Sequence, residues 1–304
     1  MMRNDEALTV DEVATILQVG RNTVYALKDK GEINSYKVGR KLRFTYADVQ
    51  SYIARSKTAR GASARESLVQ DRERFVICGQ DIILDVLSNY IAQTGIESLR
   101  AYIGSYDALT DLYKDRVQVA SSHLWDGETG EYNVPFVKKL LPSVPVVVIN
   151  LVYRMQGFYV AKGNPKGLFA WEDLFKSGVR LVNREKGAGS RVLLDERIRL
   201  LGVDPSSIEG YDVETQSHIA VASMVARGRG DVAVGSEKIA RQVEGIDFIP
   251  LQKERYDLVV KRENFDTRPV RSMMSILESG MLREEFASLG GYDTSDMGRI
   301  MWIG

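Results

Sequence analysis

A short stretch of small and polar residues, from Ser56 to Arg65, divides the sequence into two parts of different character. It has no apolar periodicity, which is typical of a linker or of the frayed end of a helix. The chain length of 304 residues also exceeds that of a typical single domain. We therefore predict a domain over residues 1–57, a linker over residues 58–71 and a larger domain over residues 72–304.

Charge is distributed unevenly between these two parts. The whole chain has 41 Lys and Arg and 41 Asp and Glu. The first 60 residues contain 11 basic and 7 acidic side chains, so the remainder is mildly acidic. Seven of the bases lie between Gly20 and Arg43, against the two acids Asp29 and Glu32. A basic N-terminal part favours a polyanion as its partner.

The composition argues against several classes of protein. No apolar run approaches the roughly 20 residues that cross a bilayer, and the first ten residues are too polar for a secretion signal. We therefore expect a cytoplasmic protein with no membrane partner. Cys78 is the single cysteine, and His123 and His218 are the two histidines, so we expect no disulfide within the chain and no metal site. No Ser/His/Asp order or paired-carboxylate motif indicates catalysis, and we expect neither catalytic residues nor a cofactor.

The first helix of the N-terminal part is indicated by a capping box. Thr9 and Glu12 have the required spacing, so that each side chain can bond the other residue's backbone N–H. Val13, Ile16 and Leu17 then give the predicted helix an apolar face. We therefore expect a helix that begins directly after Thr9.

A turn, a second helix and a hairpin follow. The turn is Gln18–Gly20, and the second helix is predicted from Arg21 to Lys28, with a stop at Gly31. Two short helices around a tight turn form a helix-turn-helix. Ile33–Phe44 alternates basic and apolar residues about a glycine turn, which predicts a hairpin, or wing, and Thr45 starts a third helix.

This segment resembles the excisionase and MerR-like winged helix-turn-helix family over about its first 55 residues. The turn, the second helix and the wing occur in the order and spacing of that family. The matching residues are Leu8-Thr9, Glu12-Val13-Ala14, Leu17, Thr23-Val24-Tyr25, Gly31-Glu32-Ile33, Val38-Gly39-Arg40 and Arg43. One departure is Asp29, which would oppose phosphate and which we expect to face away from DNA.

The resemblance implies double-stranded DNA as a partner. The start of the second helix would enter the major groove, and the wing would contact phosphates. The DNA-contacting residues expected on this basis are Arg21, Asn22, Thr23, Tyr25, Lys28, Lys37, Arg40, Lys41 and Arg43. Because one such domain covers a small site, we also expect a homodimer. The alternatives are a solvated basic face on a small helical cap and a protein-binding helix pair.

The larger part alternates short apolar runs with helical patterns. Strands are predicted at Arg74–Cys78, Leu99–Ile103, Val117–Ala120, Pro145–Asn150 and Val179–Val182. Alternating strands and helices indicate an α/β domain with a mostly parallel sheet. In such a sheet, ligands bind beyond the carboxyl ends of strands, near helix N-termini.

Small polar residues follow several of these strands. They are Gly79–Asp81, Gly104–Asp107, Ser121–His123 and Asn183–Arg191. The glycines of the last segment can turn backbone N–H groups toward an anion, while a serine and an arginine at its end add a hydroxyl and a positive charge. A plain strand–turn–helix connection would have a similar sequence.

From Phe75 to the C-terminus the chain resembles the type 2 periplasmic-binding-protein-like domain and is similar to molybdate-binding proteins. The matching residues include Ser122–Asp126, Glu128–Asn133, Arg154–Gly157, Gly163–Gly167, Asn183-Arg184, Gly187–Arg191, His218–Ala222, Gly230–Gly235, Asp247–Leu251 and Glu254–Leu258. The resemblance implies two α/β lobes joined by crossovers near Asn150–Gly157 and Phe248–Tyr256, with a ligand held between them.

The resemblance also implies a small anionic ligand, an oxyanion such as molybdate or tungstate. The expected ligand-binding residues are Gln80, Asp81, Ser105, Ser121, Ser122, Arg154, Gln156, Gly187, Gly189, Ser190, Arg191 and Gly235. The first strand–helix turn of the family usually reads Gly-Ser-His-Asp, whereas this chain has Gly79-Gln80-Asp81. The serine hydroxyl is lost there, and Asp81 either repels an anion or caps its helix.

Three functions are compatible with this sequence. The first is a one-component transcription factor in which the ligand changes DNA affinity. The second is an enzyme or a small-metabolite-binding protein of the same fold, and Cys78 is poorly placed to anchor a cofactor in such an enzyme. The third is an excisionase-type recombination accessory protein.

The two histidines have different interpretations. His218 is interpreted as a polar residue at a helix start, whereas His123 fits either a packing or a ligand role.

Overall fold

The computed structural model describes residues 7–17, 19–29, 33–39, 41–52 and 75–304. Contacts divide the chain into two units, Met1–Glu73 and Arg74–Gly304, and each is described by itself. The predicted linker, residues 58–71, lies outside the described residues. Its boundaries therefore stay a prediction.

The N-terminal unit consists of helices packed on a small sheet. Its elements are β1 (Ala7–Leu8), α1 (Val10–Leu17), α2 (Arg21–Asp29), β2 (Tyr36–Val38), β3 (Lys41–Thr45) and a helical segment over residues 46–52. The strands pair antiparallel in the order β1-β3-β2. Val13, Val24, Phe44 and Val49 form its buried core.

Local signals in the sequence explain these elements. The predicted capping box is present, because Glu12 accepts a hydrogen bond from the Thr9 backbone N–H at 2.7 Å and Thr9 Oγ1 accepts one from the Glu12 N–H at 3.3 Å. Gly39 has a φ of +59°, which suits the turn between β2 and β3. The helix-turn-helix and the hairpin are therefore confirmed, while the short strand β1 was not predicted.

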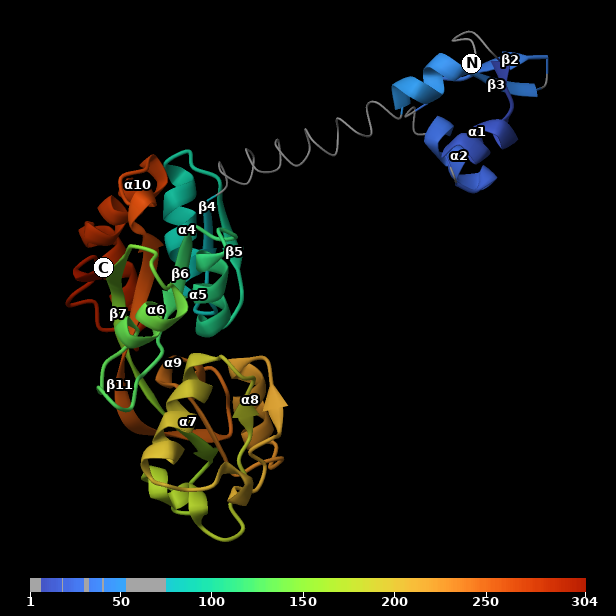
Figure 1. Cartoon of the computed structure of the whole chain (residues 1–304). Coiled ribbons are helices and arrows are strands. Elements are labelled where there is room, and N and C mark those ends of the chain that lie inside the picture. The colour runs from blue at the N-terminus through green and yellow to red at the C-terminus, as the bar shows by residue number, and fades with distance from the viewer. Residues whose placement is uncertain (1–6, 18, 30–32, 40, 53–74) are drawn as a thin grey trace. The chain divides into compact units, whose positions relative to one another are not determined.

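The C-terminal unit is a two-lobed α/β domain (Figure 1). Its strands are β4 (Phe75–Cys78), β5 (Ser98–Ala101), β6 (Val119–Ser122), β7 (Val146–Ala161), β8 (Asn183–Arg184), β9 (Glu214–Thr215), β10 (Val232–Ser236), β11 (Ile246–Lys261) and β12 (Ile300–Ile303). Its α-helices are α4 (Ile83–Gln93), α5 (Ser105–Tyr113), α6 (Val134–Leu140), α7 (Gly189–Leu200), α8 (His218–Ala226), α9 (Glu237–Ala240), α10 (Arg268–Glu278) and α11 (Gly280–Leu289). Three short 3-10 helices are η1 (Trp171–Phe175), η2 (Pro205–Ser207) and η3 (Arg262–Asn264).

The prediction of a mostly parallel sheet is wrong. The seven-stranded sheet has the order β10-β7-β11-β6-β4-β5, and β12 pairs with β7. β4 runs parallel to β5 and β6, but the pairings of β7 with β10, β11 and β12, and of β11 with β6, are antiparallel. The physical reason is that β7 and β11 are 16-residue strands that carry the chain between the lobes in opposite directions.

These two strands connect separate hydrophobic cores. One lobe contains α4, α5, α6 and α10, the other contains α7, α8 and α9, and β7 and β11 run between them (Figure 1). Leu84, Val119 and Met273 belong to a core of the first lobe, whereas Leu194 and Val232 belong to a core of the second. The register of β11 against β7 shifts between Pro250 and Gln252, and again between Tyr256 and Asp257. The predicted crossovers coincide with this stretch.

One strand boundary also differs from the sequence prediction. The expected strand Val179–Val182 is replaced by the two-residue β8, which pairs in parallel with β9, and Leu181 forms a single bridge to Val232.

Within the described part of the chain, no helix is both long and apolar enough to span a membrane.

Candidate functional site

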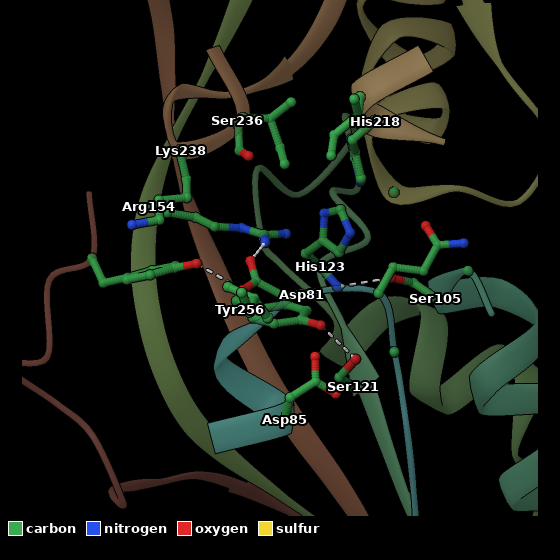
Figure 2. A pocket seen from close by; sticks show the side chains of 18 of the residues that line it. Asp81, Asp85, Ser105, Ser121, His123, Arg154, His218, Ser236, Lys238 and Tyr256 are labelled. Carbon is green, nitrogen blue, oxygen red and sulfur yellow. Dashed lines mark hydrogen bonds and ion pairs between the residues drawn. The ribbon is translucent and has the colours of Figure 1, made fainter. Parts of the chain in front are cut away.

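A cavity of about 240 Å³ lies between the two lobes. Its lining includes six residues that the sequence predicted as ligand contacts: Gln80, Asp81, Ser105, Ser121, Arg154 and Gly189. It also includes His123, for which the sequence left a ligand role open, and four residues that sequence reasoning did not assign to the site: His218, Lys238, Tyr256 and Tyr292. Figure 2 shows His123 near the middle of this pocket, with Arg154 and Asp81 on one side and Ser105 on the other.

The other predicted ligand residues do not line this cavity. They are Ser122, Gln156, Gly187, Ser190, Arg191 and Gly235. The side-chain polar atoms of Ser122, Gln156 and Ser190 are buried without a hydrogen-bond partner among the described residues. Gly235 packs against the ring of Tyr159, where a Cβ atom would lie 2.2 Å from the phenol oxygen.

Arg191 is directed away from the cavity, into the second lobe. Its guanidinium pairs with Asp195 and Glu214 at 2.9 Å each and donates to the Arg184 carbonyl at 3.0 Å. It also lies over the ring of Tyr211, 4.3 Å from the centroid. The arginine expected to supply positive charge to the ligand is thus engaged within its own lobe.

Glycines shape the first-lobe wall of the cavity. Gly79, at the end of β4, has a φ of +147°, and a Cβ atom there would lie 1.9 Å from Ser121 Oγ. Arg100 holds this turn, because it donates to the carbonyls of Ile77 at 2.7 Å and Gly79 at 2.8 Å. Ser121 in turn hydrogen-bonds the Tyr256 hydroxyl at 2.7 Å. The turn therefore brings the chain close to β6 without filling the pocket.

Helix N-termini from both lobes meet at the cavity. Ser105 and His218 are the first residues of α5 and α8, and Gly189 is the first residue of α7. Helix N-termini carry unpaired backbone N–H groups and partial positive charge. The cavity can therefore stabilise negative charge without a free cationic side chain.

Arg154 is the central cation of the cavity, and two carboxylates compensate its charge. It emerges from β7 and pairs with Asp81 of the first lobe and with Glu254 on β11, directly opposite in the strand register. Its guanidinium also lies 4.2 Å from the centroid of the Tyr256 ring. Asp81 further accepts hydrogen bonds from the Ile83 backbone N–H at 3.0 Å and the Tyr292 hydroxyl at 2.7 Å.

Glu254 is buried and ionised. Burial alone would raise its pKa, but Arg154 and His123 outweigh burial and lower the pKa to about 2. The Glu254 carboxylate lies 2.7 Å from Nδ1 of His123. The His123 backbone N–H donates to Ser105 Oγ at 3.3 Å, so the residue is held at both its ring and its backbone.

His218 has the opposite environment. Its Nδ1 atom is buried without a hydrogen-bond partner among the described residues. Burial, together with the charges of Arg184, Arg154 and His123, holds its pKa well below the ordinary histidine value. His218 is therefore a neutral side chain at the pocket wall.

The two lobes are in direct contact beside the cavity. Gln80 Oε1 accepts a hydrogen bond from Arg184 Nη2 at 2.9 Å, and the Tyr106 N–H donates to the Gly187 carbonyl at 3.2 Å. Arg184 is also paired with the neighbouring Glu185 at 2.8 Å, and its Nη1 atom is buried without a partner in the part of the chain that the structure describes. Gln80 of the first lobe thus reaches the opposite lobe.

The C-terminal segment closes one side of the cavity. The Tyr292 hydroxyl bonds Asp81 of the first lobe, while Lys238 of the second lobe donates to the Leu289 carbonyl and lies 5.7 Å from the centroid of the Tyr292 ring. Cys78 lies near this wall of the first lobe at the end of β4, where burial raises the pKa of its thiol to about 12. No cluster of three or more metal-binding side chains occurs among the described residues.

In the N-terminal unit, the predicted DNA-contacting residues lie on α2 and on the hairpin. Thr23 and Tyr25 are exposed on α2, as is Arg21, which pairs with Asp11 at 3.0 Å, and Lys41 is exposed on β3. Lys28 lies in the last turn of α2, and Arg43 is half-buried and donates to the Leu42 carbonyl. Arg40 lies outside the described residues, and the structure does not describe the side chains of Asn22 and Lys37.

Two protein families match the chain. Residues 88–278, more than half of the chain, match the PBP superfamily domain. The chain belongs to the PBP superfamily. Residues 7–57 match a helix-turn-helix domain. The fusion of these two domains, predicted from the sequence, is thereby confirmed.

Two curated proteins are similar to this chain in sequence. The uncharacterized protein YvgK of Bacillus subtilis is 38% identical over 99% of this chain and 99% of its own length. An uncharacterized protein in the ferredoxin 2Fe-2S gene 5' region of Clostridium pasteurianum is 56% identical over 36% of this chain and 97% of its own length. This PBP superfamily member and its relative from Bacillus subtilis thus match over almost their whole lengths.

Several solved structures have the same fold, and the proteins they describe differ in the ligands that they are named for. A putative phosphate ABC transporter substrate-binding protein from Clostridium perfringens, with bound phosphate, has a TM-score of 0.55 at 13% identity, with 72% of this chain and 98% of that chain covered. The tungstate ABC transporter from Geobacter sulfurreducens has a TM-score of 0.54 at 14% identity, with 71% and 99% covered. OxyR of Corynebacterium glutamicum has a TM-score of 0.52 at 14% identity, with 92% and 89% covered. At these identities the similarity establishes the PBP-like fold alone.

Proposed function

We propose that this protein is a DNA-binding transcriptional regulator whose activity is controlled by a small ligand bound between the lobes of its PBP domain. The observation that carries this proposal is the presence, in one chain, of a helix-turn-helix domain and a PBP domain with a 240 Å³ interlobe cavity. Because its target is DNA, we place the protein in the cytoplasm.

The ligand that the site favours is an oxyanion such as molybdate or tungstate. Three helix N-termini and the hydroxyls of Ser105 and Ser121 surround the cavity, and these are neutral donors suited to oxygen atoms. Arg154 does not offer a free charge, because Asp81 and Glu254 already pair with it. An oxyanion would therefore be held mainly by directed hydrogen bonds.

Asp81 favours a second candidate, a small organic ligand with a positively charged group. Its carboxylate lines the cavity, and such a group could share it with Arg154. The arginine-binding protein of Thermotoga maritima has the same fold, with a TM-score of 0.52 at 16% identity. The experiment below distinguishes the two ligand classes.

Ligand binding would act on DNA through closure of the lobes. β7 and β11 connect the lobes as paired strands, and their irregular register near Pro250 and Tyr256 gives a place for bending. In a homodimer, a change in lobe angle would alter the spacing of two DNA-binding domains. We infer a dimer because a single winged helix contacts a short site.

The test is calorimetric titration of the full-length protein with molybdate and tungstate, with sulfate, phosphate and arginine as comparisons at constant ionic strength. Micromolar or tighter binding of one oxyanion supports the proposed sensor, and DNA binding is then measured with and without that ligand. Binding of arginine alone would replace the oxyanion with the organic ligand. Equal DNA affinity with and without the bound ligand would contradict regulation.

A further inference from the structure

Four isoleucines line the interlobe cavity, two from each lobe. Ile82 and Ile103 belong to the first lobe, and Ile219 and Ile239 belong to the second. Ile103 and Ile239 are partly buried and pack against the cores of their lobes. Ile82 and Ile219 are 50% and 51% exposed, so half of their apolar surface is still open to a ligand.

A bare oxyanion has no use for this apolar surface. Its oxygen atoms gain from hydrogen-bond donors and positive charge, whereas apolar neighbours only remove water from them. Single exposed apolar residues are common on proteins, but apolar residues gathered around one concave site mark a place where a ligand binds. The cavity volume of about 240 Å³ also approaches that of pockets for organic ligands, which begin near about 300 Å³.

The apolar surface adjoins groups that favour an anion. Ile219 is the second residue of α8, directly after His218, and Ile103 lies two residues before Ser105, the first residue of α5. The first turn of a helix carries unpaired backbone N–H groups and partial positive charge. In both lobes, a site for negative charge and an apolar side chain therefore lie next to each other in the chain.

Several polar side chains elsewhere in the lining are already paired with one another. Arg154 pairs with Asp81, which also accepts a hydrogen bond from the Tyr292 hydroxyl. Ser121 hydrogen-bonds the Tyr256 hydroxyl. A second polar group on the ligand would have to break such contacts, at the cost of the hydrogen bonds lost. A ligand with one anionic group and an apolar remainder leaves them intact.

We propose that the four isoleucines form an apolar subsite, which takes the hydrocarbon part of an organic anion while its charged group lies at the helix N-termini. The chemical class is a carboxylate or phosphonate on a short apolar chain or ring. This inference rests on the proposed function and extends its oxyanion ligand to one that carries an apolar group.

The test is calorimetric titration of the full-length protein with two series of probes at constant ionic strength. One series is phosphate, methylphosphonate, propylphosphonate and pentylphosphonate, and the other is acetate, butanoate and hexanoate. We expect the affinity to rise up to about fourfold per methylene in at least one series, because each methylene leaves water for the apolar subsite. The heat-capacity change of binding should become more negative along the same series.

Substitution of the half-exposed isoleucines locates this gain. Ile219→Ser and Ile82→Ser should each lower the affinity for the longest probe more than for the shortest one. Ile303→Ser is the matched control, because Ile303 is 53% exposed and does not line the cavity. Urea denaturation checks that all three variants are folded. A gain per methylene that is the same in all three variants and in the unaltered protein would overturn the subsite.

The outcomes separate this inference from the function on which it rests. If molybdate or phosphate binds but affinity falls as the chain lengthens, the apolar subsite is wrong and the oxyanion sensor stands. If affinity rises with chain length but DNA affinity is equal with and without pentylphosphonate, the subsite stands and regulation is contradicted. If no probe of either series binds, the subsite is wrong, and titration with molybdate decides the oxyanion function separately.

Discussion

Gln80 and Arg184 join the two lobes beside the ligand cavity, with 2.9 Å between Gln80 Oε1 and Arg184 Nη2. Gln80 lines the cavity, and Arg184 is almost fully buried in the second lobe. A hydrogen bond to a charged donor that forms only when the lobes approach favours the closed state. We therefore expect Gln80 to stabilise the arrangement of the lobes in which this hydrogen bond is made.

Removal of this contact should weaken ligand binding. We expect Gln80→Ala to reduce the affinity at least about tenfold, because a hydrogen bond to a charged group contributes about 1.5–3 kcal/mol. Calorimetry gives the affinity, and small-angle scattering gives the fraction of closed protein. The control is Gln242→Ala at the same cavity. Equal losses in the two variants would contradict a specific role for Gln80 in closure.

Arg191 should act on stability. Arg191→Met removes a hydrogen bond to the Arg184 carbonyl and two ion pairs with half-exposed carboxylates. We expect a loss of about 2 kcal/mol in the free energy of unfolding, mainly from the buried carbonyl left without this donor. Urea denaturation measures this loss. A variant with unchanged stability and greatly weakened ligand binding would return Arg191 to the ligand site.

Glu254 should make the protein sensitive to acid. Its pKa in the folded protein is about 2, below the ordinary value of 4.5, so its ionised form stabilises the fold above pH 4.5 and this stabilisation is lost as the pH falls toward 2. The contribution is up to about 3 kcal/mol. The difference in unfolding free energy between the unaltered protein and Glu254→Gln should therefore be largest near pH 7 and should shrink below pH 4.5. A difference that is constant with pH would contradict this.

Gly189 should be required for the position of His123. Gly189→Ala places a methyl group against the His123 ring, 2.3 Å from Cε1, and should displace the ring and weaken ligand binding more than about tenfold. Gly280→Ala is the matched control, because an added Cβ atom there has nothing within 4 Å. Both affinities are measured by calorimetry. Unchanged binding in Gly189→Ala would show that the ring position does not matter for the ligand.

Substitutions in the N-terminal unit should distinguish residues that contact DNA phosphates from residues that contact bases. We expect Lys41→Ala to weaken binding to all duplexes alike and to reduce the slope of log affinity against log salt by about one. Thr23→Ala should instead change the preference among sequences, because Thr23 is exposed at the start of α2. Fluorescence anisotropy over a range of salt concentrations measures both effects. The reverse pattern would mean that the hairpin, and not α2, reads the bases.

Local patterns in the sequence predicted the helices and the hairpin of the N-terminal unit and the first strands of the larger domain. Capping at Thr9 and Glu12 and the break before Arg21 correspond to the observed helices α1 and α2. Each of these signals depends on residues within about one helical turn of one another. Similarity to known domains then predicted the two-lobed fold, which periodicity alone did not specify.

The full lining of the binding cavity could be identified only from the tertiary structure. Arg184 and Arg191 flank the same glycine-rich turn, but Arg184 contacts Gln80 of the first lobe whereas Arg191 pairs with Asp195 of its own lobe. The sequence could not distinguish these directions, because the direction of a side chain depends on its partners in the folded chain. The direction of the His218 side chain was likewise not predictable. Its place at a helix start was predicted, but its exposure to the cavity was not.

The sequence by itself therefore determined the helices of the N-terminal unit, the basic hairpin, the presence of two domains and the turns at the ends of the first strands, since these depend on periodicity and on glycines nearby in the chain. The tertiary structure alone decided the antiparallel course of β7 and β11, the pairing of Arg154 with Asp81 and Glu254, and the contribution of Tyr292. Asp81 and Tyr292 are 211 positions apart. Contacts over such separations arise from packing of the whole domain and leave no local signal in the chain.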